Sequence, residues 1–218
     1  RPGIPEGVQC ISHPLAPEDA RQAYVRWEDV MARTDPLPGQ PVRPAEDLAT
    51  IMYTSGTTGV PKGVMHSFAT FAHGVKAGLQ RVKALHDKAR MLSYLPLSHV
   101  AERTLVEHGL LATSMRVFFA ESMDTFAADL QRARPTAFFS VPRLWVKFQQ
   151  GVHAKVPPAK LQRLLKVPLL GRLVRRKILR ALGLDACEFA AGGAAPMPPD
   201  LLRWYSALGL DIIEVYGM

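Results

Sequence analysis

The sequence predicts an α/β protein with largely parallel sheets and helices on both faces. Two observations carry this prediction. Short apolar runs typical of buried strands alternate, from residue 48 to residue 216, with longer stretches whose apolar residues repeat at helical spacing. Successive strands are separated by about one helix each, and a strand, helix, strand unit forms a right-handed crossover between parallel strands.

The composition is that of an ordinary globular chain. Hydrophobic residues make up 48% of the 218 residues and charged residues 21%, which excludes an intrinsically disordered class. No apolar run approaches the ~20 residues that span a bilayer. Cys10 and Cys187 lie far apart with no metal or redox spacing, so we expect buried, unpaired thiols in a reducing compartment and a cytoplasmic location.

The first 46 residues carry a weaker pattern. We expect a short strand at 7–11, a helix at 17–32 and an extended connection at 35–44, where four of ten residues are proline.

The regular alternation begins with a strand at 48–54, and Ser67 is expected to cap the next helix, at 68–82. Further strands are expected at 90–95, 115–119, 136–141, 186–191 and 211–216. Further helices are expected at 100–112, 124–133, 143–152 and 199–208, with an interrupted helical stretch at 157–183, broken at Pro168 and Gly171.

The stretch after the first of these strands is predicted to bind a polyphosphate. Glycines at 56, 59 and 63 let backbone N–H groups approach an anion closely, and Lys62 adds a full positive charge. The spacing differs from a Walker A loop, because Lys62 lies between Pro61 and Gly63. Hydroxyl donors come from Thr54, Ser55, Thr57 and Thr58.

Residues 53–63, YTSGTTGVPKG, resemble the signature loop of the adenylate-forming (AMP-binding) superfamily, which includes acyl-CoA synthetases, luciferases and peptide-synthetase adenylation domains. The resemblance runs from about Asp47 to the last residue and implies a partial N-terminal domain of the acyl-CoA synthetase/luciferase-like fold. Residues 1–46 would end the first α/β subdomain and supply a proline-rich connection, and 47–218 would form the AMP-binding core, without the C-terminal domain. We therefore expect an incomplete enzyme, inactive alone.

Two further motifs follow predicted strands. Residues 190–196, AAGGAAP, resemble the family's adenine motif, which implies adenine contacts for Gly193, Ala194 and Ala195. Residues 214–218, EVYGM, resemble the start of a tyrosine-glycine-x-threonine-glutamate motif, which implies that Tyr216 stacks on adenine and that Gly217 also belongs to the nucleotide site.

Residues 94–103, YLPLSHVAER, resemble long-chain acyl-CoA synthetases more than the other branches. This resemblance implies that His99 and Val100 bind substrate near the acyl carboxylate. Residues 141–145, VPRLW, with Phe138 and Phe139 before them, would supply an apolar wall. The alternative for His99 is a helix-start histidine with a local hydrogen bond. A metal site of His99, Glu102 and His108 does not match familiar spacings.

The resemblance implies ATP-dependent activation of a fatty, long-chain carboxylic acid to acyl-AMP and then to acyl-CoA, the reaction of an acid–thiol ligase. Residues 54–59 and Lys62 would hold the β- and γ-phosphates with Mg²⁺, and Thr54 would lie nearest the metal; Lys62 and Thr54 are the candidate catalytic residues. ATP, Mg²⁺ and coenzyme A are the expected cofactors or co-substrates. Alternatives are adenylation of a medium-chain, aromatic or amino acid.

A non-enzymatic module that binds anions or nucleic acid is a further alternative, because the chain has a formal net charge of +8. Its positive charges are expected to be dispersed and lack an RNA-binding aromatic signature, so we expect no nucleic-acid partner. Basic and apolar residues interleave at 163–180, as in an amphipathic helix with a solvated charged face; contact with an anionic membrane is the alternative.

Overall fold

The computed structural model describes residues 6–39, 42–54 and 60–217. Its internal contacts divide the chain into two compact units, Arg1–Arg43 and Pro44–Met218. The functional assignment of residues 1–46 and 47–218 stays a prediction.

The smaller unit pairs two short parallel strands, β1 (Ile11–Ser12) and β2 (Val25–Arg26). The single helix predicted at 17–32 is wrong, because β2 separates α1 (Glu18–Ala23) from α2 (Trp27–Arg33). The chain leaves the helix at Tyr24 and Val25, an aromatic and a β-branched residue that favour extended backbone. The pairing of Val25 with Ile11 then takes precedence over helical continuation.

The larger unit begins with an antiparallel hairpin of β3 (Leu48–Thr54) and β4 (Lys62–Ser67), in which Thr54 pairs with Lys62. The strand at 48–54 was predicted, but β4 was not. Gly63 is exposed, but the Ile51 side chain of the opposite strand approaches it closely, since a Cβ at Gly63 would lie 2.8 Å from Cγ2 of Ile51. Helix α3 (Phe68–Arg81) follows, and the predicted cap is confirmed: Ser67 Oγ accepts a hydrogen bond from Thr70 N at 3.3 Å.

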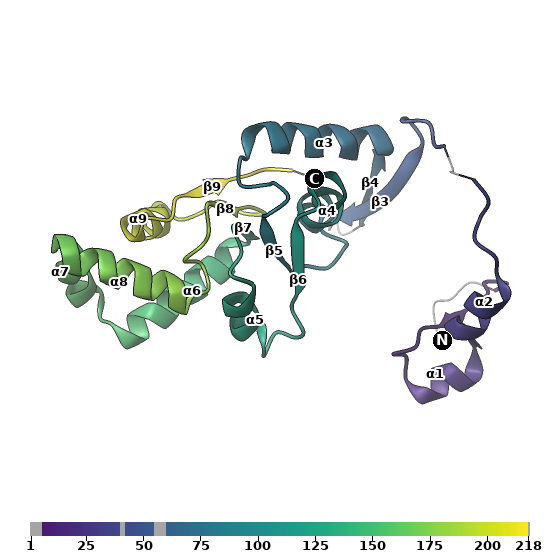
Figure 1. Cartoon of the computed structure of the whole chain (residues 1–218), viewed down its shortest axis with the longest axis horizontal. Helices are drawn as coiled ribbons and strands as arrows, with labels where there is room; N and C mark the ends of the chain where they lie inside the picture. The colour runs from purple at the N-terminus through teal and green to yellow at the C-terminus, as the bar shows by residue number, and fades with distance from the viewer. Residues whose placement is uncertain (1–5, 40–41, 55–59, 218) are drawn as a thin grey trace. The chain divides into compact units, whose positions relative to one another are not determined.

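Five strands in two parallel sheets form the centre of the larger unit, which confirms the predicted fold class (Figure 1). They are β5 (Arg90–Ser93), β6 (Arg116–Phe119), β7 (Ala137–Ser140), β8 (Phe189–Gly192) and β9 (Ile212–Glu214). β5 pairs with β6, and β8 lies between β7 and β9. β5 also lies beside β7, where Thr136 N donates to Arg90 O at 2.9 Å. Across these two adjoining sheets the strands lie in the order β6-β5-β7-β8-β9, so the order in which the chain adds strands reverses between β5 and β7.

Helices cover both faces of this sheet because alternate side chains point to opposite sides. Met91, Val117, Ala137 and Phe189 pack on one side with the π-helix η1 (Glu102–His108), which continues into α4 (Gly109–Thr113). The opposite side packs against α5 (Phe126–Ala133), α6 (Pro142–Lys155) and α9 (Pro199–Leu208). This second core contains fully buried Trp145 and Tyr205, and Tyr205 Oη donates to Trp145 O at 2.7 Å.

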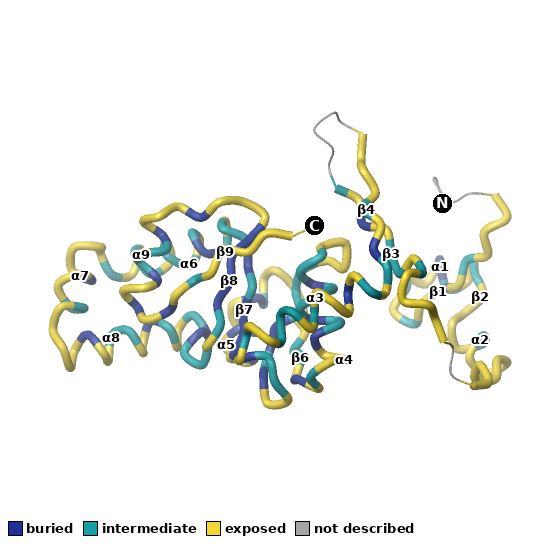
Figure 2. Tube along the Cα trace, turned by 90° about the horizontal axis from the view of Figure 1, so that it is seen from above, coloured by how far each residue is buried: buried dark blue, intermediate teal, exposed yellow. Residues whose placement is uncertain are grey.

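The helical stretch before β8 forms two helices, α7 (Pro158–Lys166) and α8 (Pro168–Ala181). The predicted interruption at Pro168 is confirmed, but the one at Gly171 is wrong. Gly171 lies inside α8, where a Cβ would be only 2.6 Å from Leu165 O, so glycine permits close contact between the two helices. Buried residues follow β7 and β8, whereas α7 and α8 are mostly exposed (Figure 2).

Both cysteines are unpaired, as predicted, but they are half-buried. Burial raises the pKa of Cys187 to about 12 and keeps this thiol protonated at neutral pH.

Candidate active site

A cavity of about 360 Å³ lies at the carboxyl ends of β7 and β8, beside the start of η1. This volume is typical of small-molecule sites. In open α/β sheets, ligands bind outside the carboxyl ends of the strands where the strand order reverses, here between β5 and β7. Two larger hollows, of about 710 and 750 Å³, lie between α3 and α4 and between α6 and α8. Leu144, from the predicted apolar wall, lines the second of them, but none of the predicted nucleotide-binding or substrate-binding residues that the structure describes lines either.

Three stretches of sequence that carry predicted site residues meet at the 360 Å³ cavity. His99 and Val100 contribute from the segment after β5. Gly193 and Ala194 contribute from the turn after β8, and Tyr216 and Gly217 from the segment after β9. Ala195, predicted to contact adenine, is exposed and does not line the cavity.

The turn after β8 brings backbone close to the cavity. A Cβ at Gly193 would lie 2.9 Å from Val215 O and 3.1 Å from the Phe139 ring, so only glycine fits without a shift. Ala194 has a φ of 70°, in the left-handed region. Val215 N donates to Gly192 O at 2.8 Å and joins this turn to the segment after β9. A flat ring could therefore lie against fixed backbone.

Tyr216 presents an aromatic ring at the same place. Its side chain is 92% exposed and lines the cavity, so the ring is free to stack on a flat ligand. An exposed aromatic ring beside small residues offers a nucleobase a surface on which to stack and space in which to lie. The residues present therefore fit the adenine ring of a nucleotide.

Glu214 has a positioning role that the sequence analysis missed. Its Oε1 accepts a hydrogen bond from Met197 N at 2.8 Å, across the turn that contains Gly193. Met197 is buried, and its Sδ would lie 3.1 Å from a Cβ at Gly192. Glu214 therefore fixes the turn after β8 to β9. The available signal was an acidic residue two positions before the motif tyrosine.

His99 lies at the helix start and also lines the cavity. The backbone N–H of His99 donates to Pro96 O at 2.9 Å, and its backbone carbonyl accepts a hydrogen bond from Glu102 N at 3.1 Å. The side chain is exposed. Because these bonds involve only the backbone, the local and the substrate-binding interpretations of the His99 side chain both stay predictions.

The predicted apolar wall is only partly correct. Phe139 and Val141 line the cavity, joined by Leu105 and Phe189, which the sequence analysis did not select. Phe138 is 1% exposed and belongs to the core on the opposite side of the sheet. Because side chains alternate along β7, Phe138 and Phe139 cannot both face one cavity. Trp145, on α6, also lies in that core and is completely buried.

A buried carboxyl group supports the segment after β5. Glu102 is 3% exposed, and its Oε1 accepts a hydrogen bond from Ser93 Oγ at 2.5 Å. Burial raises the pKa of Glu102, although the hydrogen bond from Ser93 opposes this shift. Tyr94 Oη donates to Phe139 O at 3.1 Å, and burial raises the pKa of Tyr94 to about 12. These contacts fix both ends of the segment to the sheet.

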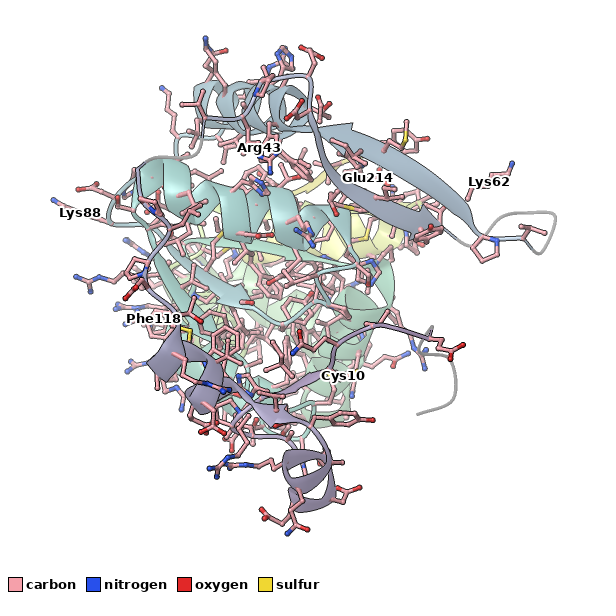
Figure 3. The ribbon with its side chains drawn as sticks, turned by 90° about the vertical axis from the view of Figure 1, so that its right-hand side faces the viewer. Cys10, Arg43, Lys62, Lys88, Phe118 and Glu214 are labelled. Carbon is pink, nitrogen blue, oxygen red and sulfur yellow. The ribbon has the colours of Figure 1, made fainter. Side chains whose placement is uncertain are left out.

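The phosphate-binding prediction falls partly outside the described residues, which omit Ser55, Gly56, Thr57, Thr58 and Gly59. Thr54 and Lys62 lie opposite each other at one end of the β3–β4 hairpin, where Thr54 Oγ1 donates to Lys62 O at 3.4 Å. The Lys62 side chain is exposed and points outward from the first residue of β4 (Figure 3). Neither residue lines the 360 Å³ cavity. Their phosphate and metal roles stay predictions.

Within the described ranges, no cluster of three or more His, Cys, Asp or Glu side chains could hold a metal ion. No helix in the described part of the chain is long and apolar enough to cross a membrane.

A cavity at the carboxyl ends of parallel strands, lined by three motif stretches, is the arrangement that the sequence analysis leads us to expect for the adenylate-forming class of enzymes. The model of the AMP-binding enzyme family matches residues 6–218. This chain belongs to that family.

Curated relatives include fatty-acid ligases. The long-chain-fatty-acid–CoA ligase ACSBG2 of Gallus gallus is 32% identical over 99% of this chain, and the peroxisomal acyl-CoA ligase 891 of Penicillium brevicompactum is 31% identical over 80%. The chain covers 33% and 28% of these two proteins, so it spans about a third of the length of the relatives it matches.

Solved structures of related enzymes share the fold. The A-PCP didomain of carboxylic acid reductase from Segniliparus rugosus, in complex with AMP, matches with a TM-score of 0.68 and 26% identity, covering 92% of this chain and 30% of that one. ATP-bound MatB from Rhodopseudomonas palustris matches with a TM-score of 0.62 and 25% identity, covering 88% and 33%. The first of these structures was solved with AMP and the second with ATP.

Proposed function

We propose that this chain carries the adenine and acyl sites of an ATP-dependent fatty acid–CoA ligase that acts on long-chain acids. The observation that carries the proposal is that predicted acyl-site and adenine-site residues line one cavity. Support for a fatty acid comes from the apolar lining by Phe139, Val141 and Phe189, and from the names of the curated relatives. Support for a nucleotide comes from the AMP and ATP in the related structures.

The reaction has two steps. A carboxylate oxygen attacks the α-phosphorus of ATP, and the bond from that phosphorus to the departing pyrophosphate breaks. The sulfur of coenzyme A then attacks the acyl carbon, and AMP leaves with the electron pair of the broken C–O bond. The substrates supply both nucleophiles, so the protein acts by aligning anions and stabilising the charge that develops.

The residues of this chain have distinct parts in that alignment. Gly193, Ala194 and Tyr216 would hold the adenine ring, and His99 and Val100 would border the acyl carboxylate. Lys62 would neutralise charge on the β- and γ-phosphates. Mg²⁺, when bound, would neutralise the remaining phosphate charge, with the Thr54 hydroxyl as its protein contact.

Calorimetry with ATP and Mg²⁺ tests the nucleotide part of the proposal. We expect Lys62→Ala to weaken binding about 10- to 100-fold, because a hydrogen bond to a charged group contributes roughly 1.5–3 kcal/mol and about 1.4 kcal/mol is tenfold. Lys83→Ala is the matched control, since Lys83 is also exposed and lies outside the site. Equal affinities for the two variants would contradict the role of Lys62. Absence of binding to a chain with an intact thermal transition would contradict a nucleotide site formed by this chain.

The nature of the acid is tested by acid-dependent exchange of pyrophosphate into ATP, in an enzyme that contains this chain. Long-chain acids should support faster exchange than medium-chain, aromatic or amino acids. Faster exchange with a medium-chain, aromatic or amino acid would contradict the fatty-acid substrate and leave the proposed adenylation reaction standing.

We also propose that the enzyme acts in the cytoplasm, and cell fractionation tests this location.

A further inference from the structure

The excess of basic over acidic residues lies in one structural feature, the helical hairpin α7–α8, and is not dispersed as the sequence analysis expects. We call this feature the basic hairpin and define it as residues 157–182. This stretch contains eight Lys and Arg residues and no Asp or Glu. The whole chain has 27 basic and 19 acidic residues, so the basic residues outside the hairpin number 19 and balance the acidic ones. The net charge of +8 is therefore the charge of the basic hairpin.

Most of these charges have no acidic partner in the part of the chain that the structure describes. No ion pair joins a basic side chain of the hairpin to an acidic one among residues 6–39, 42–54 and 60–217. Arg175 turns back onto the fold, where its guanidinium donates to Ala207 O at 2.8 Å. The charge of Arg180 contributes to lowering the pKa of Asp185, which the hydrogen bond from Arg134 lowers most. Arg172 and Arg176 lie one turn apart on α8 and are both exposed. An anionic partner would meet an uncompensated positive surface.

Large apolar side chains are exposed on the same part of α8. Leu169 and Leu173, one helical turn apart, are 82% and 65% exposed, and Val167 at the bend between the helices is 47% exposed. Positions 169, 172, 173 and 176 follow the spacing of a single helix face. The inner positions of α7 and α8 carry the packing instead, because Leu161 and Ile178 are buried in a core cluster with Leu208. The packing of the hairpin therefore does not require Leu169 and Leu173, which stay exposed to solvent.

This combination distinguishes between the possible polyanions. A nucleic acid would use the basic residues, but it would gain little from exposed leucines, and the hairpin contains no aromatic side chain that could stack on bases. An anionic lipid surface uses both features, because basic side chains meet the headgroups while leucines enter the boundary with the acyl chains.

We propose that the basic hairpin is a docking surface for an anionic phospholipid membrane, with Leu169 and Leu173 inserted and Arg172 and Arg176 against the headgroups. This inference does not depend on the proposed ligase reaction, and its test requires no enzymatic activity.

Co-sedimentation of the 218-residue chain with vesicles tests the proposal. We expect binding to phosphatidylcholine vesicles that contain phosphatidylglycerol and much weaker binding to pure phosphatidylcholine. Arg172→Gln with Arg176→Gln should weaken binding about 30-fold, at about 1 kcal/mol for each basic residue near an anionic surface and about 1.4 kcal/mol per tenfold. Lys83→Gln with Lys88→Gln, two exposed lysines elsewhere, removes the same charge and should have little effect.

The leucine pair separates insertion from simple charge attraction. Leu169→Ser with Leu173→Ser should weaken vesicle binding at least about tenfold, because burying a leucine contributes about 1.5–3 kcal/mol. Leu15→Ser with Leu37→Ser is the matched control, since these leucines are 88% and 75% exposed. A thermal transition measured for each variant verifies its folding.

Three results would overturn the proposal. They are equal binding to neutral and anionic vesicles, equal effects of the hairpin and control variants, and no vesicle binding by the folded parent chain. Salt-sensitive binding to a single-stranded RNA oligonucleotide, unchanged by the leucine pair and without vesicle binding, would assign the surface to nucleic acid instead.

Discussion

Gly193→Ala should strain the turn that borders the proposed adenine site. The added Cβ would lie 2.9 Å from Val215 O and 3.1 Å from the Phe139 ring. The first of these neighbours is backbone and is held by the hydrogen bond from Val215 N to Gly192 O. Overpacking of this kind costs about 1–3 kcal/mol, which exceeds the roughly 0.4–1 kcal/mol that a Gly→Ala change gains by restricting the unfolded chain. Each kcal/mol lost lowers Tm by about 2–4 °C in a chain of this size.

The control for this prediction is Gly217→Ala. Gly217 lines the same cavity, but a Cβ there would meet nothing within 4 Å. Thermal unfolding should therefore show a lower Tm for Gly193→Ala and an unchanged or slightly higher Tm for Gly217→Ala. ATP affinity should fall for Gly193→Ala, because the backbone against which the ring lies must shift. Equal Tm values for the two variants would refute the reasoning about close packing at this turn.

Two further predictions concern Glu102 and Ser67. The pKa of Glu102 is raised above 4.5 by burial, so the folded state binds the proton more tightly than the unfolded state. The contribution of Glu102 to the free energy of unfolding is complete below about pH 4.5 and is lost as pH rises through the raised pKa. Tm should therefore fall with rising pH over this range. Glu102→Gln should remove this fall in Tm, whereas Glu107→Gln should keep it. Ser67→Ala removes the cap of α3 and should lower the free energy of unfolding, measured with denaturant, by about 1 kcal/mol. Ser206→Ala is the control, because Ser206 is exposed within a helix, and it should leave the free energy of unfolding nearly unchanged.

The parallel sheet could be predicted because its signals are local. Each strand is a short apolar run, and each helix, such as Pro199–Leu208, has its own periodicity and end signals. Strand β4 was missed because Lys62 and Gly63 also fit a loop, and only pairing with β3 makes them a strand. The break near Val25 has a similar origin, since its partner Ile11 lies far away in sequence. The positioning roles of Glu102 and Glu214 were not predicted, because the fold brings their hydrogen-bond partners, Ser93 and Met197, next to them.

The meeting of three motif stretches at one cavity follows from strand direction. The stretches after β5, β8 and β9 each leave a strand at its carboxyl end, and in a parallel sheet all such ends lie at one edge. Their convergence could therefore be predicted once the sheet was known to be parallel. Thr54 and Lys62 differ, because they end an antiparallel hairpin outside that sheet. Parallel strand direction therefore does not predict that Thr54 and Lys62 lie at the cavity. For this reason ATP binding by Lys62→Ala tests the nucleotide proposal more sharply than ATP binding by Gly193→Ala.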